Sequence, residues 1–143
     1  MSKSLQLKAY AKVNLGLDVV RKREDGYHEV RMIMQTVRLF DRLTLERNNS
    51  GRITLSVNLP YLPVNEHNLV YRALDIMRRA YNIEDGIHAD ISKRIPEAAG
   101  LAGGSTDAAA AFVGMNQMFE LGTPQEKLME YAVALGADIP FCI

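Results

Sequence analysis

Small or apolar residues alternate with polar ones along the first part of the chain. From residue 5 to residue 19 the odd positions read Leu5, Leu7, Ala9, Ala11, Val13, Leu15, Leu17 and Val19. A period of two over that length predicts an extended chain with one buried face. Fifteen residues exceed an ordinary strand, so we expect a bend or break near Tyr10. Lys12 and Asn14 then lie side by side on the opposite face.

Three more apolar stretches before residue 60 predict strands. Residues 30–40 and 42–47 are rich in β-branched and large apolar side chains, and residues 53–59 alternate again. Asp25-Gly26 and the Asn-Asn-Ser-Gly sequence at 48–51 are typical of turns between such strands. The first sixty residues therefore predict an antiparallel meander.

A helical period appears after residue 60. Apolar residues at 69, 70, 73, 74, 77 and 81 predict an amphipathic helix, with Asn65 or Asn68 as its N-cap. Alternation at 87–91 predicts a short strand. An alanine-rich helix should follow over residues 105–119, and Gly114 within it indicates close packing against a neighbour.

The last twenty residues predict another helix and a turn. The sequence Thr-Pro-Gln-Glu at 123–126 has the form of a capping box, and Gly136 is expected to end the helix in the left-handed conformation. Asp138 then stands between small and apolar residues, either as a turn carboxylate or as a carboxylate directed into a cleft. Because the final residues are apolar, we expect a piece of a longer protein, cut where another strand begins.

Composition narrows the class of protein. The 143 residues, 48% apolar and 24% charged, predict one globular domain. Seventeen basic residues balance seventeen acidic ones, which predicts neither a nucleic-acid partner nor a membrane partner. Cys142 is the single cysteine, so no internal disulfide forms, and a cytoplasmic location is expected.

A glycine-rich stretch between the predicted strand and the alanine-rich helix carries the clearest chemical signal. Residues 93–106 read Lys-Arg-Ile-Pro-Glu-Ala-Ala-Gly-Leu-Ala-Gly-Gly-Ser-Thr. Backbone N–H groups at a helix start bind anions, and glycines let a polyphosphate approach the backbone. Ser105 and Thr106 add hydroxyls and an expected N-cap. The stretch fits neither the Walker pattern nor the Rossmann fingerprint, and the simpler alternative is a flexible turn before a packed helix.

Two pairs of polar residues are further candidates for a functional site. Tyr27 and His28 follow a charged turn, where they either stack on and hydrogen-bond to a base or anchor the loop. Lys12 and Asn14 either contribute to a site or are solvated residues on the wet face of an edge strand.

Three separated segments together resemble the GHMP small-molecule kinases. They are Ala-Lys-Val-Asn-Leu at 11–15 with Asp-Gly-Tyr-His-Glu at 25–29, the glycine-rich stretch 95–109, and Gly-Ala-Asp-Ile-Pro-Phe at 136–141. The resemblance covers essentially the whole chain. Its first segment is similar to members that phosphorylate a cytidine-diphosphate-linked alcohol on the non-mevalonate isoprenoid route. The chain differs at Tyr10 and Thr106, where the family usually has proline and serine.

The resemblance implies an architecture. It predicts an α+β fold of the ribosomal protein S5 domain 2 type, with an antiparallel sheet packed against helices. Residues 1–143 would be the N-terminal, ATP-binding domain of a kinase about twice as long. The C-terminal domain would be its partner in the same chain, and we expect residues 1–143 alone to be inactive.

The resemblance also implies residue roles. Asp138 is expected to accept the proton of the attacking hydroxyl, and Lys12 to stabilise negative charge beside it. Asn14, Tyr27 and His28 are expected to bind the substrate, with Tyr27 stacked on the cytosine. ATP is the expected phosphate donor, with Mg²⁺ whose ligands stay open. The residues expected to bind ATP are Asn68, Lys93, Pro96, Glu97, Ala98, Ala99, Gly100, Leu101, Ala102, Gly103, Gly104, Ser105 and Thr106.

Three alternatives stay open. A different GHMP kinase, acting on homoserine or mevalonate, would share the glycine-rich stretch and the aspartate. An RNA-binding module of the same fold is opposed by the balanced charge. The third alternative is a non-catalytic interaction module.

Overall fold

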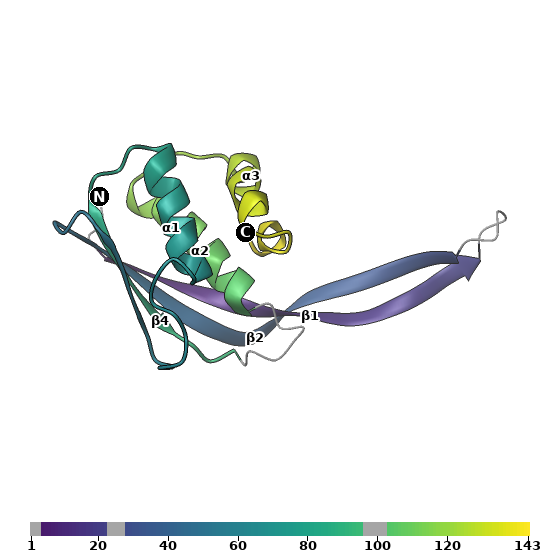
Figure 1. Ribbon diagram of the computed structural model, residues 1–143. Helices are drawn as coiled ribbons and strands as arrows, with labels where there is room; N and C mark the ends of the chain where they lie inside the picture. The colour runs from purple at the N-terminus through teal and green to yellow at the C-terminus, as the bar shows by residue number, and fades with distance from the viewer. Residues whose placement is uncertain (1–3, 23–27, 96–102) are drawn as a thin grey trace.

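The computed structural model describes residues 4–22, 28–95 and 103–143, and it describes side chains for 4–11, 39–95 and 104–143. Figure 1 shows the helices packed over one face of a sheet, with β1 and β2 continuing beyond them as a two-stranded ribbon. In chain order the elements are β1 (Ser4–Lys22), β2 (His28–Asn48), β3 (Ile53–Val57), α1 (Leu69–Ala80), β4 (Gly86–Ser92), α2 (Gly103–Met118), α3 (Gln125–Leu135) and a 3₁₀ helix, η1 (Ile139–Cys142). Within these described ranges no helix is long and apolar enough to cross a membrane.

The sheet has four strands in the order β1-β2-β4-β3. β1 pairs with β2 and β2 pairs with β4 in antiparallel fashion, whereas β3 pairs with β4 in parallel. The predicted antiparallel meander is therefore wrong in its last step, because β4 lies between β2 and β3. Parallel strands need a long crossover, and the segment containing α1 supplies it.

The two long strands differ from the prediction. β1 is one strand of 19 residues, with pairing irregularities between Tyr10 and Lys12, between Asn14 and Gly16, and further along. The expected bend near Tyr10 thus falls on a shift in register. The separate strands predicted at 30–40 and 42–47 are one strand, β2, of 21 residues. The aspartate between them does not interrupt the strand, because its side chain is fully buried and hydrogen-bonded.

The core lies between the sheet and the helices. Leu43, Leu45 and Ile87 are fully buried on the inner face of the sheet, where α2 packs. A Cβ added to Gly114 of α2 would lie 2.6 Å from Leu45 Cδ1 and 2.9 Å from Leu7 Cδ1. This contact confirms the prediction that Gly114 lets the helix approach its neighbour closely.

Asn68 caps α1 as predicted. Its side chain accepts a hydrogen bond from the N–H of Val70, and the helix covers residues 69–80. The expected cap of α2 is wrong, because the helix begins at Gly103 and places Ser105 and Thr106 inside it. The glycine-rich sequence thus runs directly into the helix.

Both ends of α3, and the residues that follow it, also differ from the prediction. Pro124 precedes α3 without any side-chain cap, and the Thr123 hydroxyl is hydrogen-bonded to Tyr81 instead. The predicted capping box is therefore wrong, because a tertiary contact takes the threonine. Gly136 has φ of −175°, an extended rather than left-handed conformation. The final residues form η1 rather than the start of a strand.

Candidate nucleotide-binding site

A cavity of about 150 Å³ lies where the N-terminal ends of α1 and α2 meet the C-terminal ends of β3 and β4. We call it the nucleotide cavity, after the ligand that the sequence predicts for Asn68 and Lys93. The carboxyl end of a parallel strand pair is a frequent ligand site, and two helix N-termini give it a positive potential. Its lining residues are Val57, Leu62, Pro63, His67, Asn68, Leu69, Ile91, Lys93, Gly104 and Asp107.

Asn68 places the start of α1 at this cavity. The Oδ1 atom of Asn68 caps the helix, and its Nδ2 donates to the carbonyl oxygen of Pro63 at 3.0 Å. The side chain therefore joins the preceding loop to the helix. The prediction that Asn68 contributes to the ATP site is consistent with this position, and it stays a prediction.

Lys93, also predicted to bind ATP, follows β4 and is buried between two aspartates. Its Nζ donates to Asp41 Oδ2 at 2.7 Å and to Asp107 Oδ2 at 2.8 Å. The three side chains are at most 6% exposed. Burial alone would lower the pKa of Lys93, but the carboxylates of Asp107 and Asp41 raise it above its usual value. The ammonium is thus held by carboxylates, and the residue still lines the cavity.

The two aspartates have different surroundings. Asp41 Oδ1 accepts from the N–H groups of Arg94 and Ile95 at 2.6 and 2.8 Å. Burial opposes ionisation of Asp41, but Asp107, these N–H groups and Lys93 together hold its pKa below the usual value. Burial, reinforced by Asp41 and opposed by Lys93, raises the pKa of Asp107 to about 8. The pKa values of the two aspartates are thus shifted in opposite directions, and Asp41 ionises at lower pH than Asp107.

The sequence analysis did not anticipate Asp41. A usable signal was present, because Asp41 shares its strand face with Leu43 and Leu45, which are buried. A charged residue on the buried face of a strand requires a buried partner. The partner, Lys93, is 52 residues away in the chain, so the signal does not identify it.

The glycine-rich sequence is described only at its C-terminal end. Residues 96–102 lie outside the described residues, so their predicted ATP contacts stay predictions. Gly103 and Gly104 begin α2, and a Cβ added to Gly104 would meet only Leu69, at 3.8 Å. No described neighbour therefore excludes a side chain, or a ligand, beside residue 104.

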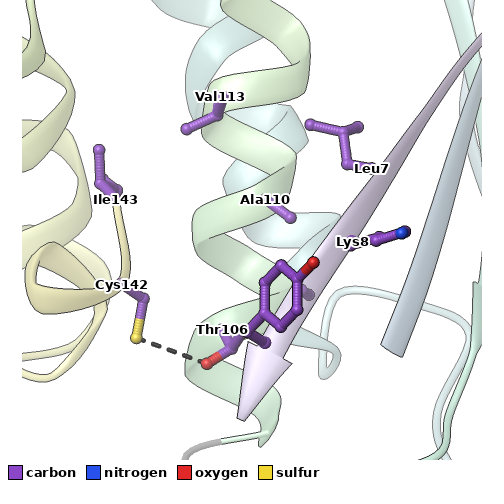
Figure 2. A pocket seen from close by; sticks show the side chains of 9 residues that line it. Leu7, Lys8, Thr106, Ala110, Val113, Cys142 and Ile143 are labelled. Carbon is purple, nitrogen blue, oxygen red and sulfur yellow. Dashed lines mark hydrogen bonds between the residues drawn. The ribbon is translucent and has the colours of Figure 1, made fainter. Parts of the chain in front are cut away.

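A second cavity, of about 370 Å³, lies between β1, α2 and η1. We call it the β1–η1 cavity. Figure 2 shows Thr106 on α2 and Cys142, the last residue of η1, at this cavity, where the threonine hydroxyl donates to Cys142 Sγ at 3.5 Å. Its lining residues are Leu7, Lys8, Ala9, Tyr10, Thr106, Ala110, Val113, Cys142 and Ile143.

The two predicted catalytic residues are close in sequence to residues that line the β1–η1 cavity. Asp138 directly precedes η1 and is exposed, and its side chain makes no capping hydrogen bond. Lys12 lies on β1 two residues beyond Tyr10, and its backbone pairs with Thr36. The side chain of Lys12 lies outside the described part, so its meeting with Asp138 stays a prediction.

The predicted substrate residues lie along the β1–β2 ribbon or outside the description. Asn14 pairs with Met34, and His28 pairs with Lys22 at the end of the ribbon (Figure 1). The side chains of Asn14 and His28, and all of Tyr27, lie outside the described residues. Among the side chains that are described, no three His, Cys, Asp or Glu residues group closely enough to hold a metal ion.

The fold and these cavities define a class of protein. The family model described as "GHMP kinases N terminal domain" matches residues 68–143, more than half of the chain. The chain therefore belongs to the GHMP kinase family, as its sequence motifs indicated. The matched residues include the first turns of α1 and α2, which border the nucleotide cavity.

Individual relatives narrow the similarity. The chain is 53% identical over 140 residues to 4-diphosphocytidyl-2-C-methyl-D-erythritol kinase of Lachnospira eligens, and 50% identical over 140 residues to the kinase of the same name in Acetivibrio thermocellus. Each alignment covers 98% of this chain and 49% of the relative. The chain thus spans about half the length of the curated relatives it matches.

Solved structures agree with this assignment. A crystal structure of 4-(cytidine 5'-diphospho)-2C-methyl-D-erythritol kinase superposes with a TM-score of 0.74 at 40% identity, covering 96% of this chain and 48% of that one. Homoserine kinase from Cytophaga hutchinsonii also gives a TM-score of 0.74, at 20% identity over 99% of this chain and 43% of that one, which shows a shared fold alone. The predicted α+β class is confirmed, with a mixed rather than antiparallel sheet.

Proposed function

We propose that this chain is the nucleotide-binding half of a kinase that transfers the γ-phosphate of ATP to the 2-hydroxyl of 4-diphosphocytidyl-2-C-methyl-D-erythritol, a step in isoprenoid precursor biosynthesis. The observation that carries the proposal is the nucleotide cavity, where two helix N-termini converge beside a glycine-rich sequence. The identity of about 50% to kinases of this name supports the choice of substrate.

The cavity suits an adenine nucleotide. Val57, Leu62, Leu69 and Ile91 offer apolar walls to a flat base. The N-termini of α1 and α2 stabilise nearby negative charge, which favours the phosphates. Asn68, Lys93 and residues 96–106 form the ATP site in this proposal.

Phosphoryl transfer requires positioning and charge stabilisation more than covalent chemistry by the protein. In this proposal Asp138 accepts the proton of the substrate hydroxyl, and Lys12 stabilises the charge that develops beside it. Exposure of Asp138 beside the β1–η1 cavity leaves its carboxylate accessible to a substrate. Mg²⁺ would arrive on the ATP phosphates and offset their charge, and its protein ligands stay open.

The cytidine end of the substrate is assigned to Asn14, Tyr27 and His28 by their sequence motif. Because the relatives are about twice as long, the second half of the full-length protein is expected to complete the substrate site. The working location is the cytoplasm, with no nucleic-acid or membrane partner, as the charge balance and single cysteine predict.

The proposal is tested on the full-length protein that contains this sequence. We expect ATP-dependent phosphorylation of the cytidine diphosphate substrate, with kcat/KM at least a hundredfold above that for homoserine or mevalonate. A preference for either alcohol would favour a different GHMP kinase. Absence of any ATP-dependent transfer, together with RNA retention on filters at low salt, would favour the RNA-binding alternative.

A further inference from the structure

Asp41, Lys93 and Asp107 form a buried ionic cluster that joins three elements around the nucleotide cavity. Asp41 lies on β2, Lys93 follows β4, and Asp107 lies on α2. Removing such groups from water costs several kcal/mol per ion, so a buried cluster is weak evidence for a stabilising role. In some proteins a buried ionic group is retained because it fixes a specific geometry.

One side of the cluster holds the main chain that precedes the glycine-rich sequence. Asn58 accepts from the N–H of Lys93 at 2.8 Å and donates to its carbonyl oxygen at 3.2 Å. Asp41 Oδ1 accepts from the next two N–H groups, those of Arg94 and Ile95. Three successive residues are therefore held by two side chains.

The other side of the cluster holds α2. The Lys93 ammonium donates to Asp107 Oδ2, so the segment 93–95 is tied to the beginning of the helix. Lys93 and Asp107 both line the nucleotide cavity, where Gly104 adds the open end of the same helix. The cluster thus connects two walls of the cavity to each other and to β2.

We propose that the Asp41–Lys93–Asp107 cluster is a brace that sets the separation of these two walls, which makes Asp41 and Asp107 positioning residues for ATP binding. Neither aspartate contacts the nucleotide in this role. The inference rests on the proposed function only in naming ATP as the ligand. A wall held in place before binding lowers the ordering cost of binding, so loss of the brace weakens ATP affinity.

Two substitutions at Asp107 test whether its hydrogen bond with Lys93 is what supports ATP binding. Asp107→Ala removes the acceptor for Lys93 and should raise both Kd and KM for ATP about tenfold in the full-length enzyme. Asp107→Asn retains an oxygen that accepts from Lys93, so we expect less than a threefold change. At saturating ATP, the KM for the cytidine substrate should change less than twofold in both variants.

A matched core variant controls for general destabilisation. Leu128 on α3 is 4% exposed and lies outside the cluster, so Leu128→Ala should lower Tm without raising the KM for ATP. The brace is rejected if Leu128→Ala raises the KM for ATP as much as Asp107→Ala does. It is also rejected if Asp107→Asn and Asp107→Ala are equally impaired.

Hydrogen exchange tests the brace without catalysis. In the nucleotide-free protein, the Arg94 and Ile95 amides should exchange at least tenfold faster in Asp107→Ala than in Asp107→Asn. Equal exchange rates in the two variants would overturn the inference. If the wild-type protein fails to phosphorylate the cytidine substrate, the proposed function fails alone, and these exchange rates still decide the brace.

Discussion

The two cavities of this domain are built in opposite ways. Around the nucleotide cavity, Asn68 caps a helix and Lys93 lies between two buried aspartates, whereas Asp107 Oδ1 has no partner among the described residues. Beside the β1–η1 cavity, Asp138 is exposed and its side chain caps nothing, and Phe141 is 66% exposed. The side chains of Asn68 and Lys93 are thus held by protein groups, whereas the carboxylate of Asp138 is exposed.

Removal of the reactive carboxylate should give the largest effect. Asp138→Asn in the full-length enzyme is expected to lower turnover by about 10²–10⁴, because the amide cannot accept the proton. ATP affinity by calorimetry should stay within twofold, since Asp138 does not line the nucleotide cavity. Asp75→Asn, a surface change on α1, is the matched control. Unchanged single-turnover rates in Asp138→Asn would remove this residue from the chemistry.

Loss of Asp41 should also lower stability. Asp41→Ala leaves the buried ammonium of Lys93 with one partner, and we expect a loss of about 3–5 kcal/mol in the free energy of unfolding. Denaturant unfolding measures this loss. Asp75→Ala, which breaks the exposed pair with Arg79, should cost less than about 1 kcal/mol. If both variants lose a similar amount of unfolding free energy, the buried cluster stabilises the fold no more than an exposed ion pair does.

The cluster should also make stability depend on pH. The pKa of Asp107 is raised to about 8, above the value of an unfolded aspartate, so the folded state retains a proton that the unfolded state releases. Its contribution to stability is full below about pH 4 and is lost progressively up to about pH 8. The stability of wild type relative to Asp107→Asn should therefore fall progressively over this range, by at most about 1.4 kcal/mol per pH unit. Parallel pH profiles would contradict a raised pKa of Asp107.

Two glycines on α2 give the smallest contrast. Gly114→Ala should cost about 1 kcal/mol, because the new methyl group would contact Leu45 and Leu7 in the core. Gly104→Ala should change stability by less than about 0.5 kcal/mol, because Leu69 at 3.8 Å is the nearest described neighbour of the new methyl group, while weakening ATP binding. Thermal unfolding and calorimetry distinguish the two. Wild-type ATP affinity in Gly104→Ala would show that the nucleotide does not approach this end of the helix.

Local sequence patterns predicted the structure correctly where the conformation of an element depends on its own residues. The apolar spacing of α1 and the cap at Asn68 were predicted, as was the close approach at Gly114. The glycine-rich sequence was correctly expected between a strand and a helix. Local reasoning was wrong at Thr123, whose hydroxyl is bonded to Tyr81 rather than to the start of α3.

The sequence by itself determined the periodicity of most strands and helices, and its motifs determined the family. Only the tertiary structure decided that β3 lies parallel to β4, and that Asp41 meets a lysine 52 residues away. The physical reason is that side-chain period records which face of an element is buried, whereas it carries no information about which distant element covers that face.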